Sequence, residues 1–261
     1  MNWRTLTPRW VWAIILWLCT LLMALVAGQT ASFLLAEQPI ILQLPIWGEI
    51  DADLAERVSG QLSRALEDDA VAGIVLRIDS PGGSPSDSER LYTEILRARE
   101  RKPVVAMVDG MAASGAYFIA AAAERIYATS LSDIGNVGVW SVARRDPIPS
   151  EDLLVSGPHK LSGISEEQQY RQLELIRQRF LQAVLSQRAG PLGPNAQLLP
   201  RGEMYLGIDA LKLGLIDEIG ALEDANDYAA QRAGVRNHRV RMACCEEEPL
   251  PPEERLKGGA R

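Results

Sequence analysis

Cysteine and histidine are both scarce in this chain of 261 residues. The three cysteines are Cys19 and the adjacent pair Cys244 and Cys245, and the two histidines are His159 and His238. This arrangement offers neither a disulfide framework nor a C-x-x-C metal or redox motif. Because so few imidazoles and thiols are present, a zinc site is improbable. We expect no metal ion and no organic cofactor.

A basic excess is also lacking. The formal net charge is -7, which excludes nucleic-acid binding through bulk charge. Hydrophobic residues make up 47% of the chain and charged residues 23%. These are ordinary globular values, so the chain can bury a core, and collagen-like and disulfide-scaffold classes are excluded.

Charged residues are missing altogether from Trp10 to Ala36, a segment that contains the apolar run Val11 to Gly28. About 20 such residues cross roughly 30 Å of hydrocarbon as a helix. The segment therefore predicts an N-terminal transmembrane helix that is retained as a lipid anchor. The alternative is a cleavable signal peptide, although its apolar core is usually shorter, about 7 to 15 residues.

The basic residues around this segment predict its orientation. Arg4 and Arg9 precede the run, whereas the next basic residue is Arg57. By the positive-inside rule the N-terminus is cytoplasmic, and the rest of the chain lies on the extracytoplasmic, periplasmic side of the cell's inner membrane as a single-pass protein.

Composition divides the chain into three parts. Residues 1–36 are the cytoplasmic N-terminus and anchor, and residues 37–243 are sized for one α/β domain. Residues 244–261 are rich in Glu and Pro and nearly free of apolar side chains, so a disordered acidic tail is expected there.

Within the central part, strand-length apolar runs alternate with amphipathic helical patterns, which predicts an α/β layered fold. The expected strands are 40–44, 71–78, 103–108 and 125–128, and the expected helices are 54–66, 88–99, 111–123, 165–187 and 222–233. Ser86 and Glu89 form a capping pattern at the start of the expected helix 88–99, and Ser165 is the expected cap of the long helix 165–187.

Two loops at strand ends carry residues suited to catalysis. Asp79 to Gly83 reads DSPGG, and paired glycines let backbone N–H groups approach a developing negative charge, although a simple flexible turn is an equal alternative. In the second loop Ser114 lies among small residues at an expected helix start, where a nucleophile would be accessible. The other interpretation of Ser114 is an ordinary helix cap.

A serine nucleophile needs a base, and two isolated histidines make a Ser-His-Asp triad hard to build. A lysine whose pKa is lowered by burial can take that role. Lys160 is the only lysine between Pro103 and Leu211. Isolated lysines are more often solvated surface residues.

Five motifs taken together resemble the signal peptide peptidase A group of S49 serine peptidases, in its short, single-domain form. They are IDSPGG (78–83), VDGMAASGAYFIAAAAERIYA (108–128), IGNVGV (134–139), VSGPHKLSG (155–163) and GIDALKLGLIDEIG (207–220). Their order and spacing match the family across about residues 40–233.

The resemblance implies a ClpP/crotonase-like fold and hydrolysis of membrane-associated peptides, including remnant signal peptides. It places Ser114 at the nucleophile position and Lys160 at the general-base position, with Gly83 and Gly115 as oxyanion-hole donors. It also implies a ring-like homo-oligomer in which neighbours can complete the Ser/Lys dyad. A strand around Val137, Gly138 and Val139 is expected to pair with an extended substrate of small or aliphatic residues.

Asp79, Ala116 and Asn136 depart from the family pattern, and Pro158 and His159 ahead of the lysine are also unusual. Ala116 replaces a frequent Gly after Ser-Gly. Asp79 replaces the usual Asn and adds a carboxylate near the oxyanion site, so we expect it to point away or to bond locally. Asn136 replaces a usual Ser, and His159 precedes the lysine and must be distinguished from it as a base. The opposing hypotheses are a non-catalytic, crotonase-like membrane protein that binds peptides or acyl groups, and a purely structural scaffold.

Overall fold

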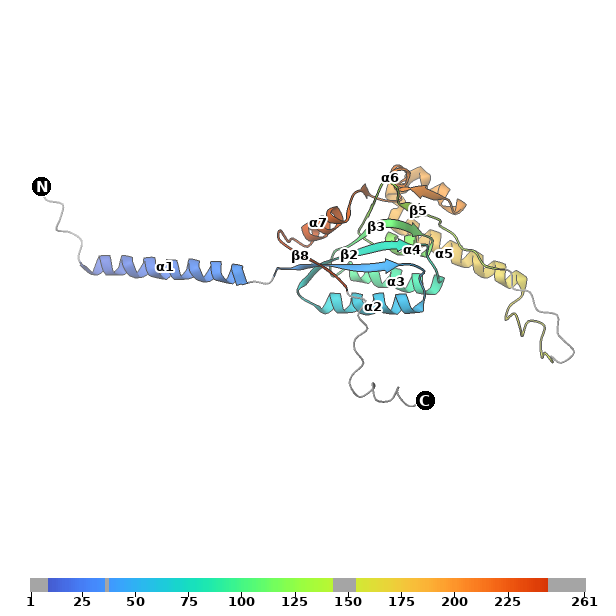
Figure 1. Cartoon of the computed structure of the whole chain (residues 1–261), viewed down its shortest axis with the longest axis horizontal. Helices are drawn as coiled ribbons and strands as arrows, with labels where there is room; N and C mark the ends of the chain where they lie inside the picture. The colour runs from blue at the N-terminus through green and yellow to red at the C-terminus, as the bar shows by residue number, and fades with distance from the viewer. Residues whose placement is uncertain (1–8, 36–37, 143–153, 244–261) are drawn as a thin grey trace. The chain divides into compact units, whose positions relative to one another are not determined.

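The computed structural model describes residues 9–35, 38–142 and 154–243 (Figure 1). The chain divides into two compact units, Met1–Gln38 and Pro39–Arg261. The expected tail at 244–261, with Cys244 and Cys245, lies outside the described residues.

The first unit contains one helix, α1 (Arg9–Leu35). The apolar run therefore does form a helix. Within the described part of the chain, however, no helix is both long enough and apolar enough to cross a membrane. Membrane spanning stays a prediction from the sequence.

The second unit is built on a mixed β-sheet, which confirms the α/β class. Its strand order is β6-β5-β3-β2-β1-β8, and β4 pairs with β3 and β7. Every pairing is parallel except that of β5 with β6. The strands are β1 (Ile40–Trp47), β2 (Val71–Ser80), β3 (Val104–Ala113), β4 (Arg125–Ala128), β5 (Asp133–Gly135), β6 (Met204–Leu206), β7 (Glu218–Ile219) and β8 (Arg239–Met242).

Helices cover both faces of this sheet. They are α2 (Ala52–Glu67), α3 (Pro85–Ala98), α4 (Gly115–Ala121), α5 (Glu166–Leu192), the 3₁₀ helix η2 (Gly193–Arg201), α6 (Gly207–Leu213) and α7 (Leu222–Arg232). In Figure 1, α2 and α3 lie on one side of the strands and α7 lies on the other. Side chains alternate between faces along a strand. Leu44 and Leu76 accordingly pack in the main core, whereas Ile41 and Val75 pack against α7.

Helix α4 is the most buried element, since all seven of its residues are buried. Tyr92 of α3, Phe118 of α4 and Phe180 of α5 form an aromatic row, with ring centroids 4.5 and 4.9 Å apart. These contacts hold three helices together directly beside the carboxyl ends of β2, β3 and β5.

Most predicted elements are confirmed, and two boundaries are corrected. Helix α3 begins at Pro85, and its cap is Ser84, whose hydroxyl accepts a bond from the Asp87 N–H at 3.4 Å. The predicted cap Ser86 lies inside the helix, because proline suits the first helical position. Residues 111–113 belong to β3, not to the expected helix, because they pair with β5 and only Ser114 turns the chain.

Candidate active site

The DSPGG loop is fixed by bonds from both of its sides. The buried Ser80 hydroxyl accepts a hydrogen bond from the Gly82 N–H at 3.1 Å. Ile50 donates its N–H to the Gly82 carbonyl at 2.8 Å and accepts from the Ser84 N–H at 2.7 Å. These two bonds pair Ile50 with Gly83 as an isolated parallel bridge, in which the N–H of Gly83 points away from Ile50. Among the described residues it has no acceptor.

Two glycines let this loop touch the start of α4. A Cβ at Gly83 would lie 2.2 Å from the Ile50 carbonyl oxygen, and one at Gly115 would lie 2.2 Å from the Ser88 Oγ. The Cβ position of Gly115 is 3.6 Å from the Gly83 nitrogen. Gly115 is the first residue of α4, so its N–H has no partner within the helix. The loop and the helix start thus bring two backbone donors together.

Ser114 makes the turn from β3 to α4 in a strained conformation, with φ of 52° and ψ of -123°. A positive φ is uncommon for a residue with a side chain. Although Ser114 holds the cap position, its hydroxyl makes no capping bond. Its N–H donates to the Gly135 carbonyl at 2.9 Å. The ordinary-cap interpretation therefore does not explain Ser114. Nucleophilic serines occupy similar strained strand-to-helix turns, which expose their hydroxyl.

A cavity of about 810 Å³ opens beside Ser114. Gly82, Gly83 and Gly115 line it, and so do Gly138 and Val139. Its apolar walls are supplied by Phe118, Val139, Trp140, Leu175, Ile176 and Phe180. Its charged lining residues are Glu49, Glu89 and Arg179. The size and the apolar walls suit several side chains of a bound peptide.

Lys160 is not among the residues that line this cavity. It lies in the exposed turns before α5, where its N–H donates to the Gly157 carbonyl at 3.2 Å. His159, the control residue, is exposed as well. The structure thus brings together Ser114, Gly83 and Gly115, but it does not place Lys160 with them in one copy of the chain.

The expected strand at Val137, Gly138 and Val139 is wrong, because β5 ends at Gly135. The chain leaves the sheet at Asn136, which has a φ of 53° and donates its side-chain amide to the Gly202 carbonyl at 3.0 Å. Gly138 and Val139 still line the cavity, whereas Val137 is buried. Their role in substrate binding stays a prediction.

The expectation for Asp79 is confirmed. Its carboxylate accepts a hydrogen bond from the Met111 N–H at 3.0 Å, and a Cβ at Gly110 would lie 2.6 Å from it. The extra carboxylate thus bonds locally between β2 and β3. In the described ranges of the chain no group of three or more His, Cys, Asp or Glu side chains is arranged to hold a metal ion.

Comparison with known proteins agrees with this geometry. The profile of peptidase family S49 matches residues 97–144 and 159–236, which include Ser114 and Lys160. "Putative protease slr0021" of Synechocystis is 32% identical over 238 residues, covering 84% of this chain and 83% of the relative. The chain belongs to peptidase family S49. Its similarity to proteins named as proteases supports classification as a serine-type peptidase.

Other S49 relatives are longer. "Protease 4" of Haemophilus influenzae is 30% identical over 72% of this chain and 33% of its own length. "Serine protease SPPA, chloroplastic" of Arabidopsis thaliana is 29% identical over 70% of this chain and 29% of its own length. The chain therefore spans about a third of these two proteins.

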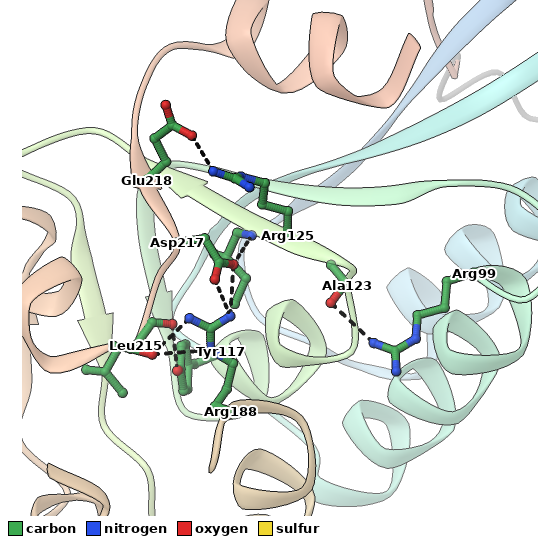
Figure 2. Close-up of polar contacts among 10 residues, drawn as sticks. Arg99, Tyr117, Ala123, Arg125, Arg188, Leu215, Asp217 and Glu218 are labelled. Atoms are coloured by element: carbon green, nitrogen blue, oxygen red, sulfur yellow. Dashed lines mark hydrogen bonds and ion pairs between the residues drawn. The ribbon is translucent and has the colours of Figure 1, made fainter. Parts of the chain in front are cut away.

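An ion pair between the buried Arg188 and the partly buried Asp217 supports α4 in this S49 chain, and no local sequence pattern predicted it (Figure 2). Arg188 of α5 contacts both Asp217 carboxylate oxygens at 2.8 Å and donates to the Gly214 carbonyl, also at 2.8 Å. Tyr117, three residues after Ser114, donates its hydroxyl to the Leu215 carbonyl at 2.8 Å. Burial raises the pKa of Tyr117 well above its ordinary value, so it remains a donor.

Sequence reasoning missed this group because its members lie far apart in the chain. It also missed Ile50, which orients the DSPGG loop, and the aromatic row beside the cavity. The sequence placed Phe118 and Phe180 only within the expected helices 111–123 and 165–187. Only the tertiary structure shows that they border the site.

Proposed function

We propose that the protein is a serine endopeptidase in which Ser114 is the nucleophile, Lys160 is the general base, and the N–H groups of Gly83 and Gly115 form the oxyanion hole. The observation that carries the proposal is the strained turn at Ser114. Its hydroxyl is not used as a cap and lies on a large cavity beside two backbone donors. A ClpP/crotonase-like fold is part of this proposal.

Acyl transfer follows from these roles. Lys160 accepts the Ser114 proton while Oγ attacks a peptide carbonyl carbon, and the carbonyl oxygen becomes an oxyanion held by the two N–H groups. The intermediate then collapses, the amine leaves with a proton, and an ester on Ser114 remains. Water hydrolyses this ester and regenerates the hydroxyl.

The exposed position of Lys160 supports a dyad completed between copies of the chain. Lys160 is exposed and does not line the cavity of its own copy, so in this proposal a neighbouring copy in a ring-like homo-oligomer supplies the base. Each active site would then require assembly. This arrangement restricts peptide hydrolysis to the oligomer.

The substrates we propose are membrane-associated peptides such as remnant signal peptides. The apolar cavity walls suit small and aliphatic side chains. Residues 137–139 would hold the peptide backbone in this proposal. The apolar run 11–28 supports a single-pass anchor, with the peptidase unit on the extracytoplasmic side.

The test is hydrolysis of a fluorogenic apolar peptide by the full-length protein and three variants. We expect Ser114→Ala and Lys160→Ala to abolish turnover while His159→Ala retains it, with folding checked by circular dichroism. If the folded, oligomeric protein binds the peptide but does not cleave it, or if Ser114→Ala cleaves as well as the unmodified protein, the non-catalytic peptide-binding function is the better account.

A further inference from the structure

Three charged side chains of the described residues line the cavity, and two of them form an ion pair with each other. The Arg179 Nε lies 2.6 Å from a Glu89 carboxylate oxygen, so this pair joins α5 to α3 across the cavity wall. Glu49 is the third, and across the described residues it has no ion pair or hydrogen bond. Among the described lining residues, Glu49 is therefore the one charged side chain without a charged partner.

Glu49 is held close to the proposed oxyanion hole by its backbone. Its neighbour Gly48 donates to the Asp79 carbonyl at 3.0 Å, and its other neighbour Ile50 forms the bridge to Gly83. Bridged strands are about 5 Å apart. Glu49 lines the same cavity as Gly83 and Ser114, so its carboxylate faces the space in which the substrate is proposed to bind.

An unbalanced carboxylate at this place opposes the reaction of a neutral peptide. The oxyanion formed at Gly83 is negative, so a second negative charge in the same cavity repels it, and more strongly where water is excluded. A positive charge on the substrate beside Glu49 removes this repulsion and adds attraction.

We infer that Glu49 is a specificity-determining residue and that the preferred substrates are apolar peptides carrying a lysine or arginine side chain close to the scissile bond. This inference rests on the proposed function, because it assigns a substrate class to the same cavity. Because Glu89 is paired with Arg179, Glu49 is the carboxylate of the described lining that is available to a cationic side chain of the substrate.

Binding to the full-length Ser114→Ala protein tests the inference without requiring catalysis. Two fluorescently labelled apolar peptides would differ only in one residue next to the scissile bond, lysine in one and glutamine in the other. We expect the lysine peptide to bind about 3- to 10-fold more tightly, as one partly exposed charge pair allows. This preference should shrink as salt is added.

Substitutions at Glu49 should change the preference in a defined order. In the same background Glu49→Gln should remove it, and Glu49→Lys should favour a glutamate peptide instead. The matched control is Asp53→Asn, which removes the same charge from an exposed residue four positions away that does not line the cavity. This control should keep the lysine preference.

Equal binding of the two peptides, binding of neither, or a lysine preference that survives Glu49→Gln would overturn the inference. The parallel measurement is the kcat/KM ratio of the two peptides with Ser114 intact. Cleavage without a charge preference would refute the role of Glu49 and leave the peptidase proposal standing. A charge preference in binding without any cleavage would support the role of Glu49 and refute the peptidase proposal.

Discussion

Ser114 has a backbone conformation that costs free energy wherever a side chain is present. Its φ of 52° and ψ of -123° lie outside the regions that L-residues prefer. Such strain is of order 1 to 3 kcal/mol and persists only where the surrounding structure enforces it. Here the bond from the Ser114 N–H to the Gly135 carbonyl, together with the pairing of Ala113 with Gly135, holds the turn in place.

Replacing Ser114 with glycine should therefore stabilise the protein while abolishing activity. We expect Ser114→Gly to raise the free energy of unfolding by about 1 kcal/mol relative to Ser114→Ala, because glycine adopts positive φ without a penalty. Urea denaturation of the two variants measures this difference. Equal stabilities would mean that the turn is not strained.

Gly83 is expected to tolerate no side chain. In Gly83→Ala the new Cβ would meet the Ile50 carbonyl oxygen at 2.2 Å, so the loop must move. If the oxyanion donor moves with it, kcat should fall by about 10² to 10³, the effect of losing one such donor. The measurement is steady-state peptide hydrolysis.

Gly138→Ala is the control for the effect of adding a methyl group to a glycine that lines the same cavity. Nothing lies within 4 Å of a Cβ at Gly138, so the variant should fold with nearly unchanged stability. A Gly83→Ala protein with normal kcat would exclude the DSPGG loop from the oxyanion hole.

At the scale of elements, α4 depends on contacts with α5 and with the segment before β7. Arg188 is nearly buried, and its partner Asp217 also accepts a hydrogen bond from the Ile126 N–H at 2.8 Å. The Asp217 carboxylate therefore joins β4 to α5. Helix α5 packs against α4, the helix that begins directly after Ser114.

Removing Arg188 should be costly. We expect Arg188→Met to lower the free energy of unfolding by about 3 kcal/mol, because the Asp217 carboxylate loses its charged partner in a mostly buried place. Arg171→Met breaks an exposed pair with Glu167 on the same helix and should cost less than about 1 kcal/mol. Similar losses in the two variants would contradict the supporting role of the buried pair.

The elements that the sequence predicted are those with a strong local pattern. The strands at 71–78 and 125–128 and the helix capped by Ser165 were foreseen from apolar runs, periodicity and capping chemistry. The strands at 204–206 and 239–242 were missed because they are short and have few buried side chains, so their place is set by pairing with β5 and β1.

The candidate site was predictable for a different reason. The DSPGG loop and the start of α4 can approach closely only where side chains are absent or small. The sequence shows this requirement directly, because it has glycine at 83 and 115 and small residues around Ser114. The buried pair of Arg188 and Asp217 and the unbalanced charge of Glu49 depend on which distant segments meet. No local pattern encodes those encounters.

At the scale of the whole molecule, the proposed dyad requires more than one copy of the chain. We expect two inactive proteins, Ser114→Ala and Lys160→Ala, to regain activity when they are co-assembled, because one supplies the lysine and the other the serine. Random mixing in a symmetric ring would restore roughly a quarter of the sites. Activity is measured after dissociation and reassembly of the mixed subunits.

Each variant assembled alone is the control for this experiment and should remain inactive. A mixture that stays inactive although both variants assemble would mean that Lys160 meets Ser114 within one copy or does not act as the base.

The most direct test of the central claim is to find the acyl group on Ser114. The full-length protein would be mixed with an apolar peptide substrate, quenched in acid after short times, and digested for mass spectrometry. We predict a substrate-derived acyl ester on Ser114 that appears before steady state and is absent from Ser114→Ala. Peptide cleavage that proceeds equally well in Ser114→Ala, with no acyl group on Ser114 of the unmodified protein, would contradict the account.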